Sequence, residues 1–280
     1  MTLIPLFSAP IYDSIERKIK AAIQSRIGPI GFPRSFLQSW FDIIKLFNKE
    51  LVLTSYGVSL ITILELILIL ITMIILQIAL LTSQLYWIIS LLITFLSTST
   101  AFSLFRAILL DNPFSSIGAF RGFYITLTVE GFFLSSLIIM LLIDVTIISR
   151  ILLFCVIAIS CYVVGSKVPF DIAEAEPEIA SGVYVELSGP LLAIALYSLQ
   201  IKRYILAQIL SYSLLKLINT SNTSVTALMT VLLTPIIWMI FGIVSAIFAR
   251  TRVDVGPSTL LKVVLILMLL IIATLTVKVV

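Results

Sequence analysis

Long runs of apolar residues, most of them without a charge, divide this chain of 280 residues. A helix needs about 20 apolar residues to cross the hydrocarbon core of a bilayer. In lipid the backbone polar groups must be satisfied within the segment, so each run should be helical. The runs are continuous rather than alternating, which does not fit a β-barrel. The sequence therefore predicts an all-α, polytopic transmembrane helical bundle that forms one integral membrane domain over residues 1–280.

The runs predict seven complete spans, near residues 55–81, 86–105, 122–143, 147–165, 187–217, 225–248 and 260–278. The fifth span is long, with Lys202 and Arg203 in its middle. It fits either two short helices or one long tilted helix. We favour one helix, because no Gly or Pro interrupts residues 191–217.

The first apolar run, Thr2 to Ile15, is too short to span and is broken by Pro5 and Pro10. It is the tail of a first span or an interfacial segment. The bundle therefore has seven complete spans plus a short or partial N-terminal one. An eighth complete span depends on whether Met1 is the true start.

The basic residues follow the loops between spans. Only 11% of residues are charged, against about 25% in soluble domains. Loops 16–50, 106–121, 166–186 and 249–262 hold thirteen Lys and Arg residues, and the opposite side holds about three. This bias orients a multi-pass protein in a cell membrane with the polar loops in the cytoplasm. It also explains the formal net charge of +4 without a nucleic-acid partner.

The cytoplasmic loop 16–50 contains a predicted amphipathic surface helix. Five apolar residues recur at helical spacing: Phe36, Trp40, Ile43, Ile44 and Phe47. Asp42, Lys45 and Lys49 lie on the other side. This pattern is typical of a helix lying along the membrane face.

Four charged residues lie away from the ends of the predicted spans: Glu65, Glu130, Lys202 and Arg203. A charge at the bilayer centre costs roughly 2.5–3.5 kcal/mol on insertion scales, and such acids often serve as proton relays. The alternative is a protonated Glu that hydrogen-bonds a neighbouring helix. The two cations need a partner, for which Glu186 and the membrane acids are candidates, or a deep aqueous cavity. Otherwise they extend to the outer interface.

Five acids fall within sixteen residues of the loop 166–186: Asp171, Glu174, Glu176, Glu178 and Glu186. Their mutual repulsion should raise some of their pKa values and make protonation cooperative. An acidic loop is often only a solvated face. The apolar residues between these acids argue that this loop packs against something.

Several chemistries are absent from the sequence. It has no His, no P-loop and no dinucleotide fingerprint. Cys155 and Cys161 are six residues apart, on different faces of a helix, so neither a disulfide nor a metal pair is favoured. We predict no catalytic residue, no metal site and no bound cofactor. In a redox machine the catalytic centre would be on another subunit.

Two loop motifs resemble those of the respiratory complex I subunit 1 family, the family of NADH dehydrogenase subunit 1 in NADH-quinone oxidoreductases. The first comprises Glu16, Arg17, Lys18, Gln24, Ser25, Arg26, Ile27, Gly28, Pro29, Leu37, Gln38, Asp42, Lys45, Leu46, Lys49 and Glu50. The second comprises Pro169, Phe170, Asp171, Glu174, Ala175, Glu176, Glu178, Gly182, Glu186, Ser188 and Gly189. Glu130, after Thr128 and Val129, matches an acid of the family's fourth span.

Three features look closer to the family's energy-converting (group 4) membrane-bound hydrogenase branch. They are the run from Gln24 to Pro29, the Ser188-Gly189-Pro190 sequence followed by Lys202 and Arg203, and the short chain. The resemblance implies eight spans and a subunit that joins a soluble redox arm to the membrane arm. It implies iron–sulfur clusters on partner subunits, and a quinone at the subunit junction in quinone-reducing branches.

The resemblance also implies roles for residues. The coupling acids would be Asp171, Glu174, Glu176, Glu178, Glu186 and Glu130, and the junction with the redox arm or quinone cavity would use Glu16, Arg17, Arg26, Asp42 and Lys45. The chain departs from the family in three ways. Only fifteen residues precede Glu16, Lys167 stands where an Arg is usual, and Leu187 replaces a Tyr. Glu65 has no clear counterpart.

The sequence therefore favours a non-catalytic membrane-anchoring and ion-coupling subunit. Electron transfer from NADH or ferredoxin elsewhere would drive proton or sodium translocation. The implied partners are a hydrogenase-like large subunit, an iron–sulfur small subunit and antiporter-like membrane subunits. The alternative is a stand-alone secondary ion transporter, which ranks lower because no internal repeat is visible.

Overall fold

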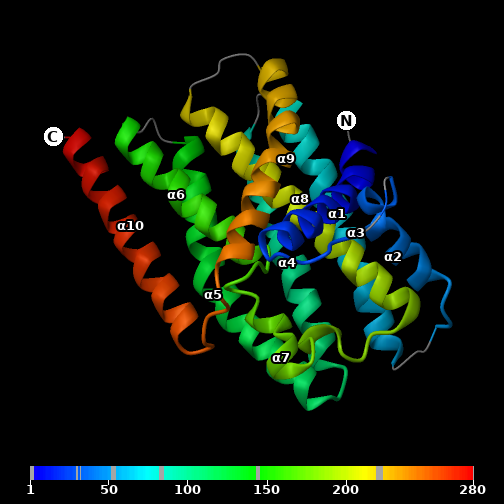
Figure 1. Ribbon diagram of the computed structural model, residues 1–280. Helices are drawn as coiled ribbons and strands as arrows, with labels where there is room; N and C mark the ends of the chain where they lie inside the picture. Colours follow the sequence, from blue (N-terminus) through cyan, green and yellow to red (C-terminus); the bar gives the residue numbers. More distant parts are fainter. Residues whose placement is uncertain are drawn as a thin grey trace.

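The computed structural model describes residues 3–29, 31, 33–51, 55–81, 85–142, 146–218 and 223–279, and is helical throughout (Figure 1). The α-helices are α1 (Leu3–Ile23), α2 (Gln38–Phe47), α3 (Tyr56–Leu81), α4 (Leu85–Ile108), α5 (Pro113–Leu142), α6 (Ile147–Val164), α7 (Glu176–Ile179), α8 (Gly189–Leu217), α9 (Thr223–Ile247) and α10 (Val255–Val279). Three short 3-10 helices complete it: η1 (Arg34–Phe36), η2 (Ile172–Glu174) and η3 (Gly182–Tyr184).

Six of the described helices are long and apolar enough to cross a membrane: α3, α4, α5, α6, α9 and α10. The chain is thus a multi-pass membrane protein, and the all-α bundle is confirmed. The predicted fifth span, α8, is one helix of 29 residues, but it is less apolar than these six. It packs against α3, α6 and α9 near the middle of the bundle (Figure 1). Because other helices cover α8, its charges can face protein instead of lipid.

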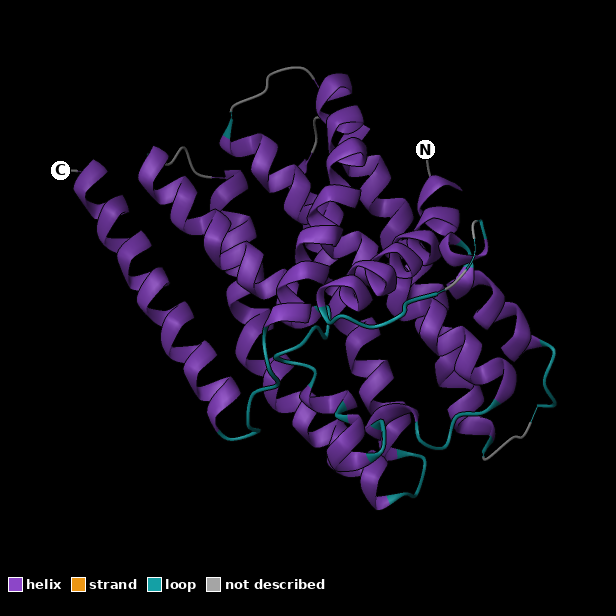
Figure 2. Cartoon of the chain, viewed as in Figure 1, coloured by secondary structure: helices purple, strands orange, loops and turns teal. Residues whose placement is uncertain are grey.

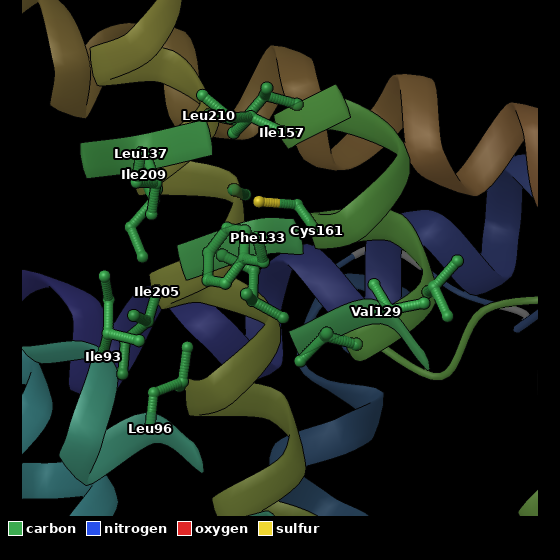
Figure 3. Close-up of a cluster of buried hydrophobic side chains, with 14 of the residues drawn as sticks. Ile93, Leu96, Val129, Phe133, Leu137, Ile157, Cys161, Ile205, Ile209 and Leu210 are labelled. Atoms are coloured by element: carbon green, nitrogen blue, oxygen red, sulfur yellow. The ribbon is translucent and has the colours of Figure 1, made fainter. Parts of the chain in front are cut away.

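The apolar core surrounds α8. Phe133 of α5, Ile157 of α6 and Ile205 of α8 are almost fully buried, and Figure 3 shows them with Ile209 and the thiol of Cys161. By contrast α10 contacts mainly α6 and α5, and lies along one edge of the bundle in Figure 1. The core therefore holds α4, α5, α6 and α8 in fixed relative positions.

The helix α1 corrects the prediction that prolines break the first apolar run. It continues from Leu3 to Ile23 with Pro10 inside. A proline cannot donate to the carbonyl four residues earlier, here that of Leu6. The Tyr197 hydroxyl of α8 donates to that carbonyl at 3.1 Å, and the Trp40 indole of α2 donates to the Phe7 carbonyl at 3.1 Å. The Tyr197 side chain thus takes the place of the missing bond, and Trp40 adds a further contact between α2 and α1.

The predicted amphipathic helix is α2, which buries Ser39 and Ile43. Two predicted loops are shorter than expected. Residues 16–23 belong to α1, and the loop 106–121 reduces to residues 109–112. The connections 109–112, 165–188 and 248–254 lie together at the lower end of the bundle in Figure 2, which we call the loop face. The charge bias predicts that this face is cytoplasmic.

The bond between Tyr197 and Leu6 should contribute measurably to stability. We expect Tyr197→Phe to lower the free energy of unfolding by about 1–3 kcal/mol, because the Leu6 carbonyl loses its donor. Thermal unfolding of the detergent-solubilised protein measures this. Tyr124→Phe, which removes a hydroxyl from a side chain that is half exposed, is the matched control. Equal melting temperatures for the two variants would contradict the assignment.

Candidate functional site

The acidic loop packs against the bundle, as its apolar residues predicted. Ile172, Ile179 and Val183 are almost fully buried. On the facing helix α5, a Cβ placed on Gly118 would lie 2.9 Å from the Ala173 carbonyl oxygen and 3.1 Å from the Gly182 Cα. Only glycine permits this approach of loop to helix. The loop acids are therefore held at fixed positions.

Three of the loop acids have specific partners on neighbouring elements. The guanidinium of Arg250, just after α9, donates to both carboxylate oxygens of Asp171 at 2.8 and 2.5 Å. Arg121 of α5 binds Glu178 at 2.6 Å. The Asn112 amide donates to Glu186 at 2.5 Å. The side chain of the predicted coupling acid Glu176 lies outside the described residues. These pairs relieve most of the repulsion expected among the acids.

Glu174 has a different environment. Tyr184 lies close to it, because η2, which ends at Glu174, packs against η3, which ends at Tyr184. Arg203 and Lys202 of α8 attract Glu174. Burial raises the pKa of Glu174, and the nearby Asp171 adds to the increase, whereas Arg203, Lys202 and Tyr184 oppose it. The pKa therefore moves in the predicted direction, although burial and not repulsion is the main cause. Glu174 is the loop acid best suited to take up a proton.

A second cluster joins α1 to the end of α6. The ammonium of Lys167 pairs with the carboxylate of Glu16, which also binds Lys20 at 2.8 Å. Burial lowers the pKa of Lys167 to about 7, although the attraction of Glu16 opposes the change. The Arg203 guanidinium donates to the carbonyls of Gly165 and Ser166 at 2.9 and 3.1 Å. A cation suits this helix end, where carbonyls are left unpaired.

Glu65 lies deeper in the bundle and pairs with Arg106 of α4, while the Ser198 hydroxyl of α8 donates to it at 3.1 Å. Arg106 is 0% exposed, so its prediction as a loop cation is wrong. Removing one partner of such a buried pair typically costs about 3–5 kcal/mol. The pair fixes α3, α4 and α8 to one another.

Glu130 of α5 accepts a hydrogen bond from the Thr100 hydroxyl at 2.7 Å. Lys202 attracts Glu130, Glu65 and Glu174, so the membrane acids are its partners and the candidate Glu186 is not. Lys202 lines a cavity between α4, α5, α6 and η2. The cavity offers about 50 Å³ to water-sized molecules, which is room for about three waters. An acidic partner or an aqueous cavity for Lys202 stays a prediction, which the nearby acids and this cavity support.

The predicted junction residues lie on α1, α2 and the connection between them. Arg17 binds Asp42 at 2.8 Å and Asp13 at 3.0 Å. Arg26 and Lys45 are exposed. Glu16 differs from them because it is buried in the Lys167 cluster. The structure thus divides this set into a clamp between α1 and α2, two exposed cations and one interior acid.

A quinone head group does not fit beside Glu16 within this chain. A Cβ on Gly242 of α9 would lie 2.7 Å from the Glu16 Cγ, so this acid fills the space against α9. The cavity next to Lys167 and Trp238 offers about 10 Å³, room for about one water. A quinone at the junction with partner subunits stays a prediction.

Sequence reasoning missed several residues that complete these clusters: Asp13, Thr100, Arg106, Asn112, Tyr184 and Arg250. Arg106 stood next to a predicted loop and was counted with it, although the apolar residues around it could have extended the span. Asp13 lay in a run treated as broken. The two Gln residues that pair inside the bundle, Gln77 and Gln208 at 2.9 Å, were detectable as amides within apolar runs.

The fold and the buried charges define an integral membrane protein whose central helix carries two adjacent cations, Lys202 and Arg203, among acids of neighbouring elements. A family model described as NADH dehydrogenase matches residues 1–276. The chain belongs to the NADH dehydrogenase family, in agreement with the resemblance of its loops to complex I subunit 1.

Two known proteins are similar to the chain. Hydrogenase-4 component C of Escherichia coli (strain K12) is 28% identical over 284 residues, which cover 92% of this chain and 87% of that protein. A chain from the structure of the membrane-bound sulfane sulfur reductase (MBS), an archaeal respiratory membrane complex, superposes with a TM-score of 0.71 at 21% identity. The match covers 95% of this chain and 96% of that one, and it supports the fold.

The Asp171–Arg250 pair should hold the acidic loop against the end of α9. Asp171→Asn removes the charge from a pair that is only partly exposed, so we expect the loop to lose about 1–2 kcal/mol of local stability. Hydrogen exchange of residues 167–188 should accelerate roughly 5–30-fold. Asp254→Asn, in a pair whose side chains are 82% and 77% exposed, is the control. Unchanged exchange in Asp171→Asn would show that the pair does not hold the loop.

Proposed function

We propose that this chain is the membrane-anchoring and ion-coupling subunit of a complex I-like or energy-converting hydrogenase-like redox complex. The observation that carries the proposal is the continuous series of ionisable groups from the loop face to the bundle interior. It begins at Glu174, passes the α8 cations Lys202 and Arg203, and reaches Glu130 and Glu65. A chain that served only as an anchor would have no need of charges at these buried positions.

The series suggests a mechanism. Electron transfer in the soluble arm would change the charge near the loop face, and Glu174 would respond by taking up or releasing a proton. Its charge acts on Lys202, which also attracts Glu130. The cavity beside Lys202 has room for water, which would let protons reach this group. Electrostatic coupling along α8 would thus link the redox reaction to proton or sodium translocation.

The relatives support a place within a multisubunit respiratory membrane complex. One is a hydrogenase-4 component and the other belongs to a sulfane sulfur reductase. The hydrogenase-4 relative favours the energy-converting hydrogenase branch over quinone-reducing enzymes. In this proposal the iron–sulfur clusters and the catalytic centre lie on a hydrogenase-like large subunit and a small subunit. The exposed cations Arg26 and Lys45 would contact that arm, and antiporter-like subunits would adjoin the bundle.

Glu174 provides a direct test of the coupling role. In Glu174→Gln the side chain keeps its size but cannot exchange a proton. We expect ion transport per electron transferred to fall roughly tenfold or more, with the redox arm still assembled. Proton or sodium uptake by membrane vesicles, measured together with the redox rate, gives this ratio. Asp254→Asn is the control, and unchanged transport in Glu174→Gln would reject the coupling role.

Purification separates the proposal from a stand-alone transporter. Under mild detergent the tagged chain should elute with iron–sulfur subunits, visible by their absorbance and by mass spectrometry. A secondary transporter would elute alone. Elution alone after mild chemical crosslinking, with ion uptake in proteoliposomes, would favour the transporter.

A further inference from the structure

Tyr184 lies between the loop acids and the ion pair of α3 and α4. It ends η3, which begins at Gly182 with a positive φ of 41°. Its ring lies 5.7 Å from the guanidinium carbon of Arg106. It also interacts electrostatically with Glu174, because η3 packs against η2, which ends at this acid. One residue thus interacts with two clusters that belong to different elements.

Arg106 has an incomplete set of partners. One of its nitrogens donates to Glu65, but Nε and the other terminal nitrogen have no hydrogen-bond acceptor among the described residues. Arg106 is also fully buried. The face of an aromatic ring attracts such a cation electrostatically. The Tyr184 ring therefore supplies part of the environment that a buried guanidinium needs.

We propose that Tyr184 is a positioning residue that couples the loop to the bundle interior. In this role its hydroxyl donates to the carboxylate of Glu174 and its ring covers Arg106, so that the charge state of the loop acid acts on the Glu65–Arg106 pair. The inference rests on the proposed coupling function and adds a second route to it, beside the route through Lys202. Tyr184 also interacts electrostatically with Glu65 and Arg203, as a position between the clusters requires.

The groups that face Glu174 determine whether its pKa rises or falls when the Tyr184 hydroxyl is removed. They are Arg203 and Lys202 from α8, Asp171 from its own loop and Tyr184 from η3. The charged groups of α5 near the loop and Lys202 are Arg121, bound to Glu178, and Glu130. Burial raises the pKa of Glu174, and Tyr184 opposes that increase. Loss of the hydroxyl should therefore raise the pKa further.

The test is Tyr184→Phe in the assembled complex, which keeps the ring over Arg106 and removes only the hydroxyl. Infrared titration follows the Glu174 carboxyl band, identified by its disappearance in Glu174→Gln. We expect the titration midpoint, and the acid limb of the ion-transport profile, to move to higher pH by about one unit or more. Tyr124→Phe, on the exposed face of α5, should move neither.

A fluorotyrosine at position 184 gives an independent variant that preserves the side chain. Its more acidic hydroxyl donates more strongly, so the Glu174 midpoint should move to lower pH. An unmoved midpoint in both variants, with transport still lost in Glu174→Gln, would overturn the role of Tyr184 and leave the proposed function intact. Unchanged transport in Glu174→Gln would instead overturn the proposed function. Opposite shifts in the two variants would establish the positioning role.

Discussion

The structure depends on the cost of placing charges inside a membrane bundle. A buried ion is stable only where a partner or water compensates for its lost hydration. Lys202 and Arg203 lie side by side on α8, and neighbouring helices supply what they need: carboxylates for Lys202 and the carbonyl ends of α6 for Arg203. The packing of α8 against α3 and α6 agrees with this, because Glu65 of α3 and the carbonyls that follow α6 are among the groups that compensate these cations.

The same constraint explains the acidic loop. Its apolar residues are inserted against α5, where Gly118 lets the backbone approach, and this packing brings Glu174 next to the α8 cations. A loop that followed the membrane surface would leave its acids in water with ordinary proton affinities. The packing of the loop against α5 therefore holds one acid, Glu174, where burial and positive charge act on it together.

The sequence predicted the elements better than the contacts. Continuous apolar runs and the absence of Gly or Pro in 191–217 were enough to predict the spans and the single helix α8. The prolines of α1 led to a wrong prediction, because local sequence rules contain no information on distant residues. Tyr197, almost two hundred positions further along the chain, donates a hydrogen bond to the Leu6 carbonyl that Pro10 leaves without a donor. Likewise the sequence identified Glu65 as an acid within a span, but its pairing with Arg106 depends on how α3 and α4 pack. Motifs identified the acids, whereas tertiary structure determined their partners.

The partners divide the acids into two kinds. Asp171 and Glu65 pair with arginines, which stay protonated in proteins, so these pairs serve as anchors for the loop and for α3 and α4. Glu130 and Glu174 are instead matched with Lys202 and Tyr184, and a lysine or a phenol can lose or share a proton when its surroundings change. The arginine pairs hold the loop and the helices in place, and we expect Glu130 and Glu174 to exchange protons within that structure. Ion coupling is therefore expected where carboxylates face lysine and tyrosine, along α8, and not at every acid that the sequence contains.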